Sequence, residues 1–216
     1  GYSERNADTA VEPRLCMQWY LSMQHFADIA LPPVLEGKIK FHPQKYVTTY
    51  RNWLENIVDW NLSRSRYWGT PLPIWRTEDG KEEKCIGSVA ELRKEIDKAV
   101  AAGVMKENPY AGKDFDLHRP YIDGVVLVSD SGKPMRREPD LIDVWFDSGA
   151  MPYAQIHYMG EELRPDQFPA DFIAEGVDQT RGWFYTLHAI ATMCFDSVAF
   201  KNVISNVLGL DKNGNK

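Results

Sequence analysis

A strand–helix–strand pattern near the end of the chain constrains its fold more than any other feature. Residues 171–175 and 203–208 are short apolar runs that contain the β-branched and aromatic side chains typical of buried strands. Between them, residues 179–195 space apolar side chains along one face of a long helix. A strand, a helix and a strand with a crossover of this length predict parallel strands with a right-handed connection. We therefore expect an α/β fold built on a parallel sheet.

Further elements are expected earlier in the chain. Periodic apolar residues predict helices over residues 46–60 and 89–101. Continuous apolar runs predict buried strands over residues 15–21 and 141–146. The hydrophobic runs of residues 76–140 are short and this segment is rich in charge, so we expect it to be an insertion rather than part of the main core.

The charge and cysteine content exclude several classes of protein. The 216 residues carry 25 Lys and Arg against 31 Asp and Glu, which argues against a chain whose main role is to grip phosphate backbones. Cys16, Cys85 and Cys194 lie far apart with no CxxC pair, so neither a zinc site nor a disulfide framework is expected. No uncharged apolar run approaches the roughly 20 residues of a membrane helix. These features predict a cytoplasmic chain without a membrane partner.

Polar residues follow the first strand of the parallel pair. Such sheets bind ligands outside the carboxyl ends of their strands, and Glu175, Gly176, Asp178 and Gln179 stand there. Glycine permits close backbone approach, while carboxylates and an amide suit an ammonium group and ribose hydroxyls. Asp178 would equally serve as a helix cap. Spacing alone leaves a ligand site and a capping role open.

Two tryptophans accompany this turn. Trp145 lies in the apolar run of residues 141–146, and Trp183 directly precedes Phe184, the first residue of the apolar stripe of the following helix. A tryptophan near a buried strand is usually core. Two that converge at strand ends would instead form the walls of an apolar pocket with few polar groups. Spacing favours core packing and leaves the pocket as the alternative.

Three segments carry a family resemblance. Residues 56–75 (NIVDWNLSRSRYWGTPLPIW), 143–149 (DVWFDSG) and 169–184 (PADFIAEGVDQTRGWF) resemble successive signature segments of the class I aminoacyl-tRNA synthetases. The resemblance covers about residues 51–216 and is closest to the isoleucine-specific branch. The first 50 residues look more like the valine-specific branch.

The resemblance implies a fold and a division of the chain. The fold would be the second half of a Rossmann-type parallel sheet with an inserted smaller α+β region. The expected regions are a connector after an editing domain, the start of the second Rossmann half, an inserted connective region, and the remainder of that half up to the Lys-Met-Ser-Lys-Ser loop. In the same order, their bounds are residues 1–45, 46–75, 76–140 and 141–216.

The resemblance also implies a reaction and its site. The parent enzyme would activate isoleucine with ATP and Mg²⁺ and transfer it to tRNA, with no covalent nucleophile. Amino-acid binding would fall to Trp145, Trp183, Asp178 and Gln179. Adenylate or ATP binding would fall to Glu175, Gly176, Asp178, Gln179, Asn206, Gly209 and Lys216. A slot between indoles excludes larger side chains, but one missing methylene is worth only about 1–3 kcal/mol, so valine would also enter.

Several expectations concern what the chain lacks. It contains no His-Ile-Gly-His motif, and the Lys-Met-Ser-Lys-Ser loop would be cut at Lys216, so it resembles an internal fragment that is inactive alone. An uncovered sheet edge and apolar cleft predict self-association. No zinc is expected. The alternatives are a fragment of a valine- or leucine-specific relative, or a non-catalytic half-Rossmann module that binds a partner.

Overall fold

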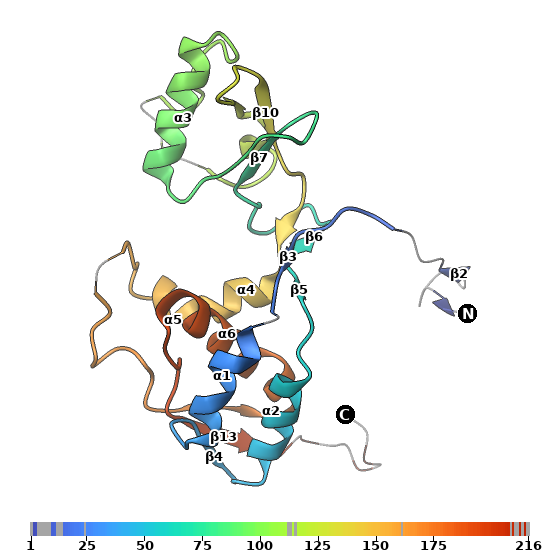
Figure 1. Ribbon diagram of the computed structural model, residues 1–216, viewed down its shortest axis with the longest axis vertical. Helices are drawn as coiled ribbons and strands as arrows, with labels where there is room; N and C mark the ends of the chain where they lie inside the picture. Colours follow the sequence, from blue (N-terminus) through green and yellow to red (C-terminus); the bar gives the residue numbers. More distant parts are fainter. Residues whose placement is uncertain are drawn as a thin grey trace.

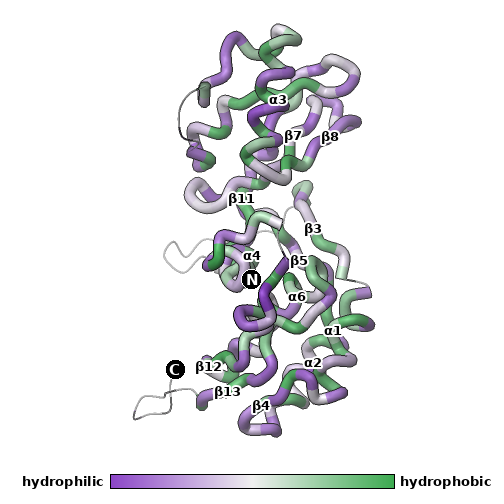
Figure 2. The backbone as a smooth tube through the Cα atoms, turned by 90° about the vertical axis from the view of Figure 1, so that its left-hand side faces the viewer, coloured by the Kyte–Doolittle hydropathy of each residue, from purple (hydrophilic) through white to green (hydrophobic). Residues whose placement is uncertain are grey.

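The molecule forms two lobes that follow one another along its longest axis (Figure 1). This architecture comes from a computed structural model. It describes residues 2–3, 10–11, 15–23, 25–111, 114, 116–160, 162–207, 209, 212 and 214. Each lobe has its own cluster of buried hydrophobic residues. Figure 2 accordingly shows hydrophobic stretches of chain in both lobes.

The first lobe contains the parallel sheet. Its strands are β4 (Lys40–His42), β12 (Ile173–Gly176) and β13 (Asn202–Asn206), in the order β12-β13-β4. Both pairings are parallel, with Ile173 opposite Val203 and Gly176 opposite Asn206. The α/β class with a parallel sheet is therefore confirmed.

Helix α6 (Trp183–Phe195) makes the crossover between β12 and β13, after a 3₁₀ turn, η2 (Val177–Arg181). Its residues Phe184 to Thr192 are all buried, because α1 (Phe26–Leu35) and α2 (Tyr46–Glu55) join it in the core. His188 on α6 makes a 2.8 Å hydrogen bond from Nε2 to the carbonyl of Ala30 on α1. Burial lowers the pKa of His188, so this core favours its neutral form. Within the described ranges, no helix is both long and apolar enough to cross a membrane.

The second lobe is an antiparallel sheet covered by a helix. Its strands are β7 (Ile74–Thr77), β8 (Glu83–Cys85), β9 (Val126–Val128) and β10 (Pro134–Arg137), in the order β8-β7-β10-β9. Helix α3 (Val89–Ala101) begins at Ser88, whose side chain accepts a hydrogen bond from Glu91 N. A 3₁₀ turn, η1 (Tyr121–Gly124), precedes β9. Trp75, Ile96, Leu127 and Met135 pack in its core.

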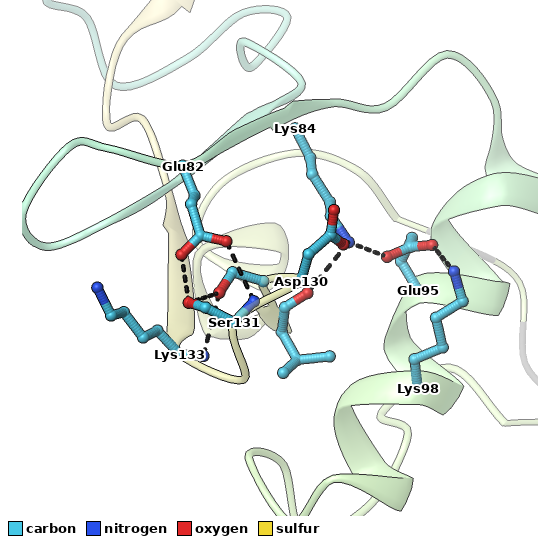
Figure 3. A network of polar contacts seen from close by, with 9 residues as sticks. Glu82, Lys84, Glu95, Lys98, Asp130, Ser131 and Lys133 are labelled. Carbon is cyan, nitrogen blue, oxygen red and sulfur yellow. Dashed lines mark hydrogen bonds and ion pairs between the residues drawn. The ribbon is translucent and has the colours of Figure 1, made fainter.

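Charged groups tie this sheet to α3 (Figure 3). Lys84 Nζ lies 2.9 Å from Glu95 Oε2, and Lys98 pairs with the other oxygen of the same carboxylate. The side chain of Glu95 is only 10% exposed. Burial acts to raise the pKa of Glu95, but the hydrogen bonds and charges of Lys98 and Lys84 outweigh it, so the pKa is lowered.

This network predicts an acid-sensitive second lobe. A carboxyl group whose folded pKa is depressed stabilises the fold above its unfolded pKa, near 4.5 for Glu95, and loses this contribution as pH falls through the folded pKa. We expect Glu95→Gln to lower the stability of the lobe by about 1–3 kcal/mol near neutral pH. We also expect a smaller further loss in the variant than in the wild type on acidification. Calorimetry between about pH 7 and pH 3.5 measures both effects.

The exposed Glu107, changed to Gln, serves as the matched control in the same lobe. An equal acid response in Glu95→Gln and wild type would remove Glu95 from the account.

Two expected strands differ from the structure. The run of residues 141–146 contains only the short strand β11 (Leu141–Ile142), paired with β6 (Ser63–Arg64), and then becomes helix α4 (Val144–Gly149). Asp143 accounts for the change, because its buried side chain accepts a hydrogen bond from Trp145 N and caps the helix. The other run, residues 15–21, is strand only at β3 (Tyr20–Leu21), which pairs with β5 (Trp60–Asn61). Leu15 is fully exposed, so that run was wrongly assigned to the core.

The remaining elements are short. Helix α5 (Met151–Ala154) follows α4 directly. At the start of the chain, β1 (Tyr2–Ser3) and β2 (Ala10–Val11) form an antiparallel pair.

Helices α4 and α6 touch at a glycine. A Cβ on Gly149 would lie 2.9 Å from the backbone oxygen of Thr186 and 2.9 Å from Ile190 Cδ1. The backbone of a buried helix cannot easily move away, so Gly149→Ala should lower stability by about 1–3 kcal/mol in thermal unfolding. Gly124→Ala is the control, because its Cβ would meet nothing within 4 Å. Equal melting temperatures for the two variants would contradict this close packing.

Candidate functional site

The carboxyl ends of β12 and β13 form one edge of the first lobe. The parallel register places Glu175 beside Ser205 and Gly176 beside Asn206. Glu175 and Asn206 are exposed there, and Gly176 is half-buried. Glu175, Gly176 and Asn206 were all expected at the site. They share this edge although Asn206 comes from a later strand of the chain.

The turn η2 connects this edge to α6 and carries Asp178 and Gln179. Gln179 Oε1 accepts a 3.0 Å hydrogen bond from Trp183 N, in the first turn of α6. A capping role for Asp178 was one of two open expectations, and this contact gives a capping role to Gln179. With its oxygen held in this way, the amide nitrogen of Gln179 is the group able to donate to a ligand.

The two expected tryptophans lie on either side of a helix–helix junction. Trp183 is half-buried, and its indole Nε1 donates a 3.0 Å hydrogen bond to the carbonyl of Ser148 at the end of α4. Trp145 stands in the first turn of α4 and is 41% exposed. The indole N–H of Trp183 therefore fixes α6 against the helix that carries Trp145.

Gly182 is the point at which Gln179 and Trp145 meet. A Cβ on Gly182 would lie 2.7 Å from Gln179 Oε1 and 3.2 Å from a ring carbon of Trp145. Trp183 is its chain neighbour. A side chain at this position would therefore displace both Gln179 and Trp145, and glycine allows them to approach each other.

A cavity of about 210 Å³ opens beside Trp145. Tyr185 and Gly182 of the α6 region line it, and its charged groups include Arg181, whose guanidinium lies 5.6 Å from the ring centre of Trp53. Trp183 and the residues from Glu175 to Gln179 are not among its lining residues. The lining residues contributed from the earlier part of the chain are Trp53, Ile57, Val58, Asp59, Trp60, Asn61 and Arg64. Of the predicted site residues that the structure describes, only Trp145 reaches this cavity.

Sequence reasoning missed Trp60 and Tyr185 as cavity residues. The available signal was the density of tryptophan, with four between Trp53 and Trp75. Periodicity along one segment does not reveal that Trp53 and Trp60 line a cavity together with Trp145.

Two other residues, Gly209 and Lys216, were expected to bind the adenylate or ATP. Gly209 is exposed, and Lys216 lies outside the described residues. No group of three or more His, Cys, Asp and Glu able to hold a metal occurs in the part of the chain that the structure describes. Cys16, Cys85 and Cys194 are free and exposed. The expectation of no zinc stays a prediction.

The parallel sheet places this chain in the α/β class of proteins. Open α/β sheets bind small ligands at the carboxyl ends of their strands, where this chain has the polar turn η2 and, beside it, the aromatic cavity. A family model described as tRNA synthetases class I (I, L, M and V) matches residues 3–216. The chain belongs to this family.

Similar proteins agree with this assignment. An isoleucine–tRNA ligase of Cytophaga hutchinsonii is 71% identical over 185 residues, covering 84% of this chain and 16% of that protein. One of Bacteroides fragilis is 64% identical over 200 residues, covering 84% of the chain and 18% of that protein. The cytoplasmic isoleucine–tRNA ligase of Mus musculus is 44% identical, covering 97% of the chain and 16% of that protein.

A solved LeuRS–tRNA–LeuAMS ternary complex from Agrobacterium radiobacter K84 shares the fold. Its TM-score is 0.50 at 16% identity, and the match covers 74% of this chain and 20% of that one. The chain thus spans about a sixth to a fifth of the length of these relatives.

Proposed function

We propose that this chain is the part of an isoleucine–tRNA ligase that holds the amino acid and its adenylate. The named relatives support isoleucine as the substrate. The observation that carries the proposal is the close approach of Trp145 and Gln179 to Gly182, beside Trp183, whose backbone N–H bonds Gln179 and whose indole bonds the end of α4. ATP with Mg²⁺ and a tRNA would be the other substrates.

In the proposed reaction, the carboxylate of isoleucine attacks the α-phosphorus of ATP, which gives isoleucyl-adenylate and pyrophosphate. A hydroxyl of the tRNA then displaces AMP. Such a reaction needs positioning and stabilisation of phosphate charge rather than a protein nucleophile. Residues of this chain would supply the positioning.

The two indoles would enclose the aliphatic side chain. Burial of a branched side chain against aromatic rings is worth about 1.5–3 kcal/mol. Asp178 and Gln179 would bind the polar parts of the amino acid, since a carboxylate accepts from an ammonium group and the amide nitrogen donates. Binding of the adenylate would fall to Glu175, Gly176, Asp178, Gln179, Asn206, Gly209 and Lys216.

The reaction is tested in the full-length gene product that contains this chain. Pyrophosphate exchange is measured with isoleucine, valine and leucine as separate substrates. We expect isoleucine to be preferred over valine by about 10–200-fold in kcat/KM, the range that one methylene allows. Preference for valine or leucine would move the protein to another branch of the family.

Exchange with none of the three amino acids would favour the second candidate, a non-catalytic module that binds a partner.

The organisation of the parent protein is part of the proposal. Residues 1–45 would follow an editing domain, and residues 76–140 would be an insertion between two parts of the second Rossmann half, residues 46–75 and 141–216. The separate buried cluster around Trp75 supports the insertion. The cytoplasm is the proposed location, in agreement with the printed name of the mouse relative.

Self-association is proposed for the isolated chain. In its parallel sheet, β12 and β4 each have only one neighbour among the described strands. Open strand edges favour pairing between molecules. Sedimentation of the purified chain at several concentrations measures this, and a monomer throughout would contradict it.

A further inference from the structure

The carboxylate of Asp143 is a buried charged group that lines the cavity. Its side chain is 4% exposed. Trp60 Nε1 donates to Oδ2 at 2.8 Å, and Arg64 Nη2 lies 2.9 Å from the same oxygen. Oδ1 accepts from Trp145 N at 3.3 Å. One buried carboxylate therefore joins β5, β6 and the first turn of α4.

The partners of Asp143 are themselves held. Arg64 Nη1 donates to the carbonyls of Asn61 and Ser63 at 2.7 and 2.9 Å, which fixes the guanidinium in one orientation. The ring of Trp60 lies 6.1 Å from that of Tyr185 on α6. The backbone N–H of Asp143 donates to Leu62 O at 2.7 Å. The carboxylate thus has little freedom to move.

The location of Trp145 follows from this arrangement. Its backbone N–H is bonded by Asp143, while its ring is in contact range of Gly182, where α6 begins. Trp145 is 41% exposed, so packing alone leaves much of its ring without neighbours. A wall that must match a small aliphatic side chain needs its supporting contacts to be rigid.

We infer that Asp143, with Trp60 and Arg64 as its bonded partners, is a positioning residue that sets the place of Trp145 and so the fit of the amino acid. This inference rests on the proposed function. In this inference Asp143 acts through α4 rather than through a contact with the substrate. Replacement of its charge would loosen the first turn of α4. It would leave in place the strand ends at Gly176 and Asn206, where the adenylate is proposed to bind.

The test is Asp143→Asn in the full-length gene product, measured by pyrophosphate exchange. We expect KM for isoleucine to rise by about tenfold or more, because small misplacements of a site wall have effects of this order. KM for ATP and the kcat per active site should stay within about twofold. A merely structural role would lower the active fraction without changing KM for isoleucine, and that result would overturn the inference.

A double-mutant cycle shows whether the effect passes through Trp145. In Trp145→Ala, the further change Asp143→Asn should leave KM for isoleucine unchanged, since the wall that Asp143 positions is gone. Additive effects would overturn the inference. If Trp145→Ala raises KM and Asp143→Asn does not, the positioning role fails while the proposed function stands. If Trp145→Ala itself leaves KM unchanged, the role of Trp145 in the proposed function fails, and the positioning role with it.

A readout that needs no catalysis completes the design. Fluorotryptophan labelling gives Trp145 its own ¹⁹F resonance, assigned by its loss in Trp145→Phe. Asp143→Asn should shift or broaden this resonance, and an unchanged resonance would overturn the inference. Asp123→Asn is the matched control, because it breaks a carboxylate–arginine pair with Arg137 in the second lobe. If Asp143→Asn does not fold, Arg64→Gln removes one donor at a side chain that is 36% exposed, with the same expected result.

Discussion

Trp183→Ala in the full-length gene product should raise KM for isoleucine by about 10–100-fold in pyrophosphate exchange and leave KM for ATP within about threefold. The physical reason is the loss of one aromatic wall of the proposed amino-acid slot, together with the Nε1 hydrogen bond to Ser148 O at 3.0 Å that fixes α6 against α4. Trp183→Phe keeps an aromatic ring without the N–H group. It should fall between the wild type and the alanine variant.

The control for this experiment is Trp68→Ala. Trp68 is 69% exposed and stacks on His118, outside the group around Gly182. Its loss should leave both KM values unchanged. Unchanged KM for isoleucine in Trp183→Ala would remove Trp183 from the slot, whatever the effect on stability.

Trp75→Ala should unfold the second lobe and spare the first. Trp75 is 2% exposed, and its Nε1 donates a 3.0 Å hydrogen bond to Val125 O. Removal of a buried tryptophan costs about 3–5 kcal/mol, which is large for a core of this size. Hydrogen exchange read by mass spectrometry should show lost protection in α3 and β10 and retained protection in α6.

The reverse experiment is Phe184→Ala, which removes a fully buried ring from the core of the first lobe. It should deprotect α6 and spare α3. Loss of protection in both lobes in either variant would show that the two clusters unfold as one cooperative unit.

Local patterns predicted the elements whose own residues determine them. The bounds of α3 agree with the expected helix over residues 89–101, because Ser88 caps it and an apolar stripe runs along it. The pair β12 and β13 with its helical crossover also follows from periodicity and from the handedness of such connections. The parallel class of the sheet was therefore readable from one segment of the chain.

The errors fall where tertiary contacts override local preference. The run of residues 141–146 is rich in strand-forming side chains, but Asp143 inside it bonds to Trp60, 83 residues earlier, and starts a helix instead. The exposed Leu15 shows the same error with the opposite cause. An apolar run that has no packing partner forms no strand there. No periodicity indicates either outcome.

The residues of the candidate site were also predictable from the sequence only in part. The rule that ligands bind at the carboxyl ends of parallel strands selected Glu175 and Gly176 from the sequence, and the family resemblance added Asn206. The role of Gly182 depends on how closely Trp145 and Gln179 approach it in space, which only the fold reveals. Trp60 and Tyr185 likewise reach the cavity through packing between separate segments.

The most direct test of the central claim is a crystal structure of the full-length gene product with a non-hydrolysable isoleucyl-adenylate analogue. We predict that the aliphatic side chain lies between Trp145 and Trp183, with the adenylate over the edge formed by Gly176 and Asn206. An analogue bound away from these two rings, or rings too far apart to contact one side chain, would contradict it.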